Sequence, residues 1–241
     1  MRVTLLGTGS ADGWPNPFCT CASCAHARRS GDVRTQTAAL VDDALLLDAG
    51  ADAPRQAARL GVDLRELRAV LVTHAHPDHL APAMLLWRSW TTPPHPLRVI
   101  GPALVVETAR PWLGPHDPVV LEPVRPGDTV EIASAAGSYT VRVLAAAHAG
   151  HAHPHEPVAA EAVLYDVTAP DGTRLLHATD TGPLPPATLE AVGGAGFDLV
   201  LLEETFGDVT DHGTGHHDLA TFPATLRDLR HAGAVVAGTR V

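Results

Sequence analysis

Short apolar runs, which are typical of strands, alternate along the chain with segments that have the spacing of amphipathic helices. The run Val70–Thr73 is rich in β-branched residues and uncharged, which predicts a central strand covered on both faces. Tyr139–Leu144 alternates apolar and polar residues and predicts a half-buried strand. Leu80–Trp90 has a helical pattern in which Pro82 falls within the first turn, where proline is tolerated. No internal period indicates a repeat protein.

The same patterns, together with turn residues between them, predict the remaining elements. Further strands are expected at Arg2–Leu6, Ala38–Val41, Ala44–Asp48, Leu97–Ile100, Val119–Leu121, Thr129–Ile132, Ala162–Thr168, Thr173–His177, Phe197–Glu203 and Ala234–Val241. Further helices are expected at Ala25–Gly31, Ala53–Leu60, Leu104–Trp112, Pro185–Val192 and Leu219–His231.

Three histidines and an aspartate follow the strand that ends at Thr73, within six residues: His74, His76, Asp78 and His79. They occupy a tight loop at the carboxyl end of a buried strand, which is where ligands bind in open α/β sheets. Imidazole and carboxylate are good ligands for zinc, manganese and iron. His74 and His76 can point the same way, while Asp78 and His79 can aim at a second point, so the spacing favours two metals. A merely solvated loop is the weaker alternative, because buried polar groups need partners.

The segment His74–His79 carries the full signature of the metallo-β-lactamase superfamily, and the chain resembles that family over nearly its whole length. The resemblance implies an α/β fold, a four-layer αββα sandwich of two mixed sheets flanked by helices, as a single domain over residues 1–241. It also implies two ligands beyond the loop. His148 matches the third metal histidine, and Asp180 matches the aspartate that bridges both metals, although a turn-capping role for Asp180 stays open.

The chain has three cysteines, Cys19, Cys21 and Cys24. An odd number of cysteines in an apparently cytosolic protein does not favour structural disulfides. The spacing Cys-x-Cys-x-x-Cys instead suits three ligands of a structural zinc whose fourth ligand lies elsewhere. Three free thiols are the alternative. The same pattern after a Gly-x-Gly loop resembles one branch of the superfamily. That branch includes the phosphoribosyl cyclic phosphate phosphodiesterase of the carbon–phosphorus lyase pathway and the pyrroloquinoline quinone biosynthesis protein B group.

Within this branch, the resemblance implies a phosphodiesterase that acts on a small, in some cases cyclic, phosphodiester through a metal-bound hydroxide. Two divalent ions, zinc or manganese with iron as an alternative, are the expected cofactors. Asp78 and His216 are the candidate catalytic residues, with His216 as proton donor, and Arg34 is the candidate contact for an anionic substrate. Hydrolysis of a lactone or thioester, iron-dependent oxygenation, and a non-catalytic role beside a biosynthetic pathway remain alternatives.

Three acidic residues at two strand ends have open roles. Asp48 either orients a ligand histidine or caps the helix near Ala53. Glu203 and Glu204 could bind metal, but a solvated pair at the rim is the favoured interpretation.

The end of the sequence departs from the family pattern. Family members carry a histidine after the last strand that completes the second metal site, and this branch carries another that completes the structural zinc. The sequence stops at Gly238–Val241, before either. A truncated chain is the favoured expectation. A site with one metal, or replacement by another histidine, stays open; the replacements considered are His151, His153, His212 and His217.

Composition narrows the function classes further. The 241 residues include no lysine and 17 basic residues, all arginine, which excludes lysine-based covalent catalysis. The formal net charge is −10 without a basic run, which weakens the case for nucleic acid. No apolar run reaches membrane-spanning length, and the N-terminus has no charged region followed by an apolar one. A soluble cytoplasmic protein with a small anionic substrate is expected, and a homodimer is kept open.

Overall fold

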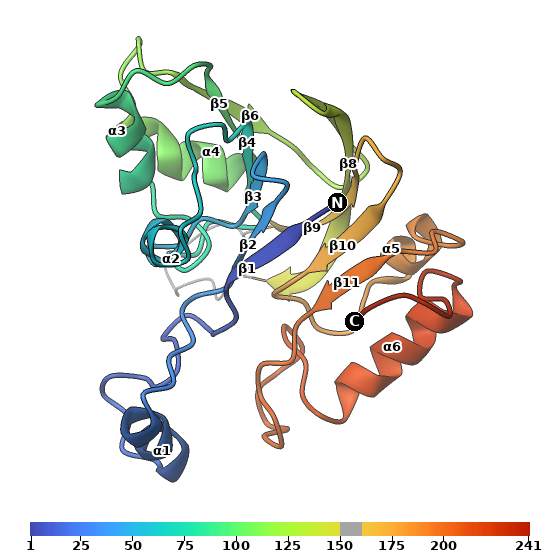
Figure 1. The fold of residues 1–241 in the computed structure, drawn as a ribbon. Helices are drawn as coiled ribbons and strands as arrows, with labels where there is room; N and C mark the ends of the chain where they lie inside the picture. The colour runs from blue at the N-terminus through green and yellow to red at the C-terminus, as the bar shows by residue number, and fades with distance from the viewer. Residues whose placement is uncertain (150–160) are drawn as a thin grey trace. The chain divides into compact units, whose positions relative to one another are not determined.

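The computed structural model describes residues 1–149 and 161–241 of the chain. These residues form two compact units, each built around one mixed sheet (Figure 1). The N-terminal unit comprises Arg2–Ile100 and Val105–Glu122, and the C-terminal unit comprises Met1, Gly101–Leu104 and Pro123–Val241. The single domain predicted over residues 1–241 stays a prediction.

The sheet of the N-terminal unit has six strands in the order β1-β2-β3-β4-β5-β6. Their bounds are β1 Val3–Gly7, β2 Ala38–Val41, β3 Leu45–Leu47, β4 Ala69–Leu71, β5 Leu97–Gly101 and β6 Val119–Pro123. The first three strands pair antiparallel, whereas β3, β4 and β5 run parallel. Because parallel strands end at the same edge, the residues that follow β3 and β4 are neighbours, and this edge carries the predicted metal loop.

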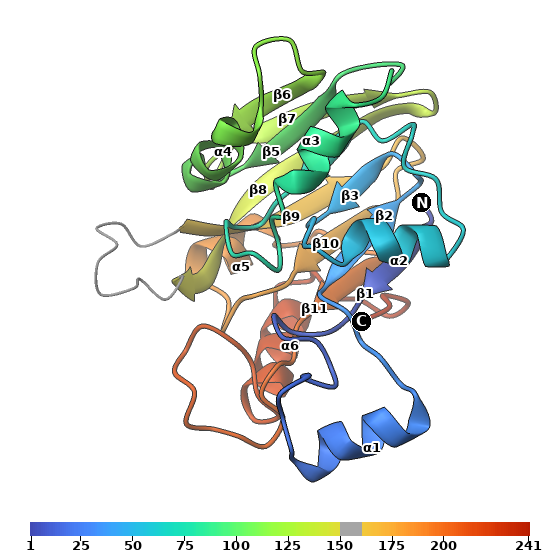
Figure 2. The ribbon, with the colours of Figure 1, turned by 90° about the vertical axis from the view of Figure 1, so that its left-hand side faces the viewer.

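Helices α2, α3 and α4 pack on the strands of this sheet, whereas α1 lies away from them (Figure 1). The helix bounds are α1 Ala22–Ser30, α2 Ala53–Arg59, α3 Ala83–Ser89 and α4 Ala103–Ala109, with a 3₁₀ turn at Arg110–Trp112. Figure 2 shows α2 and α3 lying against the strands. Ala57 of α2, Leu85 of α3 and Val105 of α4 join a core that includes Leu46 and Val70 of the central strands. Burial of these apolar side chains fixes the strand ends from which the polar loop projects.

The sheet of the C-terminal unit has five strands in the order β11-β10-β9-β8-β7. Their bounds are β7 Thr129–Ser134, β8 Gly137–Ala149, β9 Glu161–Thr168, β10 Arg174–Ala178 and β11 Leu199–Leu202. Helices α5 (Pro186–Ala191) and α6 (Thr221–His231) pack on it through a core that includes Leu176, Val192 and Leu229. β10 and β11 are parallel, with Ala178 opposite Leu202, so the residues after both strands meet at one edge.

The strand predicted at Ala234–Val241 is wrong. Thr239 N donates to Val236 O at 3.1 Å and closes a turn, and Gly238 has a φ of 114°, which no regular strand adopts. Within the described residues, this segment forms an isolated bridge from Arg240 to Leu199 instead of a strand. The other predicted strands and helices all occur, with shifts at their ends.

Among the described residues, no helix combines the length and the apolar character that a membrane crossing requires.

Candidate metal centre

Asp48 is the buried anchor of the histidine loop in the N-terminal unit. Its Oδ1 accepts hydrogen bonds from Thr73 N at 2.8 Å and Thr73 Oγ1 at 2.9 Å. Its Oδ2 lies 2.9 Å from His79 Nδ1, and the side chains of Asp48 and His79 are both fully buried. A carboxylate in this place holds the proton on Nδ1, so Nε2 of His79 carries the lone pair that a metal requires. Of the two roles left open for Asp48, the structure favours orientation of a ligand histidine, since the residue before α2 is Asp52.

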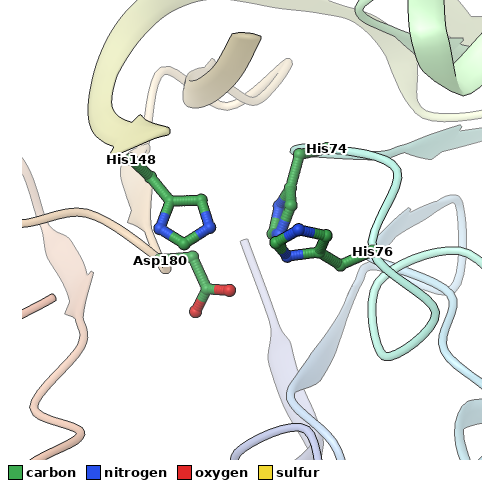
Figure 3. A group of neighbouring side chains, drawn as sticks. All are labelled: His74, His76, His148 and Asp180. Atoms are coloured by element: carbon green, nitrogen blue, oxygen red, sulfur yellow. The ribbon is translucent and has the colours of Figure 1, made fainter. Parts of the chain in front are cut away.

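The Thr73 hydroxyl fixes the tautomer of a second histidine. It donates to Asp48 and therefore accepts from His74 Nδ1, which lies 3.0 Å away. The lone pair of His74 is then on Nε2, which lies 2.8 Å from His76 Nδ1. Figure 3 shows the rings of His74 and His76 close together on this loop. Two imidazole nitrogens facing each other at this distance form a pair of metal-binding atoms suited to a cation such as zinc.

Asp78 and His79 form the second pair that the sequence predicts. Asp78 Oδ2 lies 3.1 Å from His79 Nε2, the ring nitrogen that Asp48 leaves as a lone pair. The N-terminal unit thus presents two pairs of donors, His74 with His76 and Asp78 with His79, as the spacing of the motif predicts.

Gly50 allows the chain to pass directly beneath this loop. A Cβ at position 50 would lie 2.0 Å from the backbone oxygen of Asp78. Ala49 N also donates to His79 O at 2.8 Å, which ties the two segments together. The close approach of Gly50 to Asp78 fixes the position of the histidine loop relative to the ends of the strands.

Replacing Gly50 with alanine should therefore destabilise the fold by about 1–3 kcal/mol and displace Asp78, because backbone cannot yield as a side chain does. Gly114→Ala is the matched control, since its Cβ would meet its nearest atom at an ordinary 3.7 Å. Urea unfolding of both variants measures the difference. Equal stability of the two would contradict the close approach.

In the C-terminal unit, His148 lies near the end of β8 and Asp180 follows β10 (Figure 3). His148 Nδ1 lies 3.0 Å from Gly215 O, a contact that requires a proton on Nδ1 and leaves Nε2 as the ligand atom. A ring nitrogen of His148 and a carboxylate oxygen of Asp180 come within 4.8 Å. Asp180 has a φ of 51°, in the left-handed region, which turns the chain sharply after β10.

The interpretation of Glu203 and Glu204 as a solvated pair at the rim is wrong for Glu203, because its carboxylate is engaged in hydrogen bonds within the protein. Its Oε1 lies 2.8 Å from His216 Nδ1 and accepts from Thr181 N at 3.1 Å. Its Oε2 accepts from Thr205 Oγ1 at 2.6 Å and from His217 N at 3.3 Å. Only Glu204 is exposed, as predicted. Glu203 thus holds the ring of the predicted proton donor and fixes its proton on Nδ1.

We expect Glu203→Gln to lose about 1–3 kcal/mol of stability and much of the activity, because one oxygen becomes an amide group facing two donors. The neighbouring Glu204→Gln serves as control, since its amide oxygen can still accept from Gly207 N. Urea unfolding and initial rates measure both effects. An unchanged Glu203→Gln variant would show that His216 is held by other contacts.

A cavity of about 650 Å³ opens beside these residues within the C-terminal unit. Its walls are small residues and three imidazoles: Ala146, Ala147, His148, Pro183, His212, Gly213, Thr214, Gly215 and His216. His217 is fully buried, and burial lowers its pKa, which favours a neutral ring. His216 therefore faces the cavity while its neighbour belongs to the interior.

His212 and His217 were possible replacements for a missing ligand. His212 Nε2 lies 3.2 Å from Asp218 Oδ2, and its ring stacks on Phe206 with centroids 4.1 Å apart. His217 Nδ1 lies 3.2 Å from Thr221 Oγ1. Neither joins a group of metal donors among the residues that the structure describes. His151 and His153 lie outside the described residues.

The three cysteines form a separate group in the N-terminal unit, with their sulfur atoms within 4.8 Å of one another. All three are free thiols. The backbone N–H of Cys24, followed by the side chain of Cys19, lowers the pKa of Cys21 to about 7, while burial raises the pKa of Cys24. The geometry fits the predicted zinc ligands, and zinc binding stays a prediction.

Arg34 lies on an exposed segment that pairs with Trp14. Its guanidinium carbon is 5.8 Å from the centre of the Trp14 ring, a stacking contact rather than an ion pair. The role of Arg34 toward a substrate stays a prediction.

Comparison with known proteins identifies the family. A model described as "Beta-lactamase superfamily domain" matches residues 44–237. The chain belongs to the metallo-β-lactamase superfamily. The metallo-β-lactamase fold protein YhfI from Bacillus subtilis has a TM-score of 0.65 at 18% identity, covering 96% of this chain and 82% of that one, which confirms the fold class predicted from the sequence. Zn²⁺-bound PqqB from Methylobacterium extorquens has a TM-score of 0.69 at 21% identity, covering 100% of this chain and 79% of that one. A diphosphatase from the PhnP family has a TM-score of 0.72 at 21% identity, covering 95% and 82%.

A curated relative in the metallo-β-lactamase superfamily has higher identity over a shorter stretch. Ribonuclease Z of Mycobacterium marinum is 37% identical over 113 residues, which cover 45% of this chain and 36% of that enzyme. The match therefore extends over little more than a third of the relative's length.

Proposed function

We propose that the chain is a metal-dependent hydrolase that cleaves a small phosphodiester. The observation that carries the proposal is the set of histidine tautomers. His74, His79 and His148 each have the Nδ1 nitrogen engaged by a hydroxyl, a carboxylate or a carbonyl oxygen, so each has Nε2 as the lone-pair atom. The chemistry of three histidines prepared in this way, together with the carboxylates of Asp78 and Asp180, matches the requirements of divalent metal ions.

In this proposal His74, His76 and His148 hold one metal, Asp78 and His79 hold a second, and Asp180 contributes to both. The support is the donor chemistry within each unit and membership of a superfamily of metal-dependent hydrolases. When bound, divalent cations at these residues supply Lewis-acid chemistry, which lowers the pKa of water and stabilises negative charge on a phosphoryl group.

The chain's own residues supply the proton. With Nδ1–H held by Glu203, His216 in its imidazolium form gives its Nε2 proton to the leaving alkoxide, and the Glu203 carboxylate stabilises the positive charge on the ring before the transfer. The cavity beside His216 accommodates the leaving group. Arg34 is the proposed contact for the substrate's negative charge, as an always-charged group that suits a phosphate.

A phosphodiester is favoured over other substrates by two similarities. Ribonuclease Z is a nuclease by name, and a diphosphatase of the PhnP family shares the fold. The acidic balance of −10 favours a small substrate over a long nucleic acid in this chain.

The test is a screen with bis-p-nitrophenyl phosphate, a phosphonate ester and a lactone, each with added Zn²⁺ or Mn²⁺ and with a chelator as control. We expect metal-dependent turnover of the phosphodiester and loss of activity on chelation. Hydrolysis of the lactone alone would overturn the phosphodiester assignment. Metal binding without turnover of any substrate would favour a non-catalytic role, and elemental analysis of the same samples reports how many ions are bound.

A further inference from the structure

Cys21 and Cys24 occupy a special position at the start of α1. Cys21 is the residue immediately before the helix, with extended backbone angles of φ −62° and ψ 161°. Its sulfur accepts a hydrogen bond from Cys24 N at 3.4 Å. Cys21 is exposed, whereas Cys24 is only 6% exposed. The two sulfurs lie within 4.8 Å of each other.

This arrangement is that of a dithiol which exchanges with disulfides. The Cys21 sulfur is accessible to small molecules, so it can attack them and be attacked by them. The backbone N–H groups at the start of α1 stabilise negative charge on this sulfur. The second sulfur sits one turn further on, shielded from solvent. The first turn of α1 contains no acidic residue that would oppose a thiolate.

Spacing distinguishes this pair from the third cysteine. Residues three apart at a helix start have Cβ atoms about 5–6 Å apart, and a disulfide needs about 3.5–4.5 Å, so a small shift of Cys21 closes the bond. Cys19 lies outside the helix, where its sulfur accepts from Cys21 N at 3.4 Å. The Cys19 sulfur also lies within 4.8 Å of the other two, so Cys19 can hold a cation together with the pair.

We propose that Cys21 and Cys24 form a reversible disulfide, in competition with metal binding at the three cysteines. The oxidant is a low-molecular-weight disulfide. The Cys21 thiolate attacks one of its sulfurs, the sulfur–sulfur bond breaks, and one thiolate leaves. Cys24, after losing its proton to solvent, attacks the Cys21 sulfur of the mixed disulfide and expels the second thiolate. The protein loses two protons and two electrons, and the oxidant becomes two thiols.

The inference is independent of the proposed hydrolase activity, and its test measures sulfur chemistry. The full chain is treated with oxidised glutathione, before and after metal removal with a chelator, and is then analysed by intact mass, peptide mapping and thiol titration. We expect the metal-free protein to lose two hydrogens and to fall from three free thiols to one. A reductant should restore all three, and prior loading with Zn²⁺ should slow the reaction at least tenfold.

Two variants make the result specific. Cys19→Ser should still form the internal disulfide, because it retains both members of the pair. Cys24→Ser should instead accumulate a glutathione adduct on Cys21, because the second attack is impossible. A disulfide that includes Cys19, glutathione adducts spread over all three cysteines, or thiols that do not react in the metal-free protein would each overturn the proposal.

Discussion

Replacing Asp180 with asparagine should lower kcat/KM for a phosphodiester by about 10³-fold or more while the fold persists. The change keeps the size of the side chain and removes its negative charge. In the proposed site that charge holds both cations, and loss of metal-assisted stabilisation costs about 4 kcal/mol or more of the activation free energy. Asparagine also tolerates the left-handed backbone at this position, where φ is 51°. Alanine there would add a backbone cost of about 1–2 kcal/mol and confuse the result.

The matched control is Asp43→Asn. Asp43 also has a left-handed backbone, with a φ of 58°, and lies in the exposed turn between β2 and β3. Its ion pair with Arg2 is on the surface, where such pairs contribute about 0–1 kcal/mol. Initial rates, thermal unfolding and metal content should be measured on both variants. Turnover by Asp180→Asn near that of the wild type would remove Asp180 from the active site.

Much of the fold was predictable because its signals are local. The buried run before Thr73 and the polar loop after it are adjacent in sequence, and the structure shows β4 ending at Leu71 with the loop directly beyond. The hairpin around Asp42 and Asp43 is local in the same sense. Burial of short apolar runs decides such elements, and these runs can be recognised without knowing what packs on them.

The role of Glu203 could not be predicted in the same way. Two adjacent glutamates at a strand end look alike in sequence. Which one turns inward depends on the parallel pairing of β11 with β10, and on a loop that returns His216 to the same edge. Both depend on contacts between residues that are far apart in the sequence. The false strand after Ala234 has the same origin, because a strand exists only where a partner accepts its hydrogen bonds.

Asp48→Asn should reduce the metal affinity of the histidine loop by about 10–100-fold without unfolding the protein. Thr73 N is a donor that cannot change, so the amide oxygen of asparagine must face it, at the place where Oδ1 accepts now. The amide group then faces His79 Nδ1, where Oδ2 lies now at 2.9 Å. Two donors cannot share a hydrogen bond, so the proton of His79 must move from Nδ1 to Nε2.

In the Asp48→Asn variant the His79 proton would occupy Nε2, the atom that has to bind the metal. His79 Nε2 would then donate to Asp78 Oδ2, 3.1 Å away, and both members of this donor pair would be engaged with each other. The hydrogen bonds remain complete, so we expect a change in stability within about 1 kcal/mol. Asp48→Ala differs, because three buried donors would lose their acceptor, at a cost of about 3 kcal/mol or more.

The measurement separates orientation from folding. Competition with a chromogenic chelator gives the zinc affinity, nitrogen NMR of the imidazoles reports which ring nitrogen carries the proton, and urea unfolding gives the stability. Asp43→Asn again serves as control, because Asp43 has the same φ of 58° and pairs with Arg2 on the surface. Wild-type affinity together with an unchanged Nδ1 proton in Asp48→Asn would mean that backbone position alone orients His79, and that the buried carboxylate stabilises the loop rather than the metal.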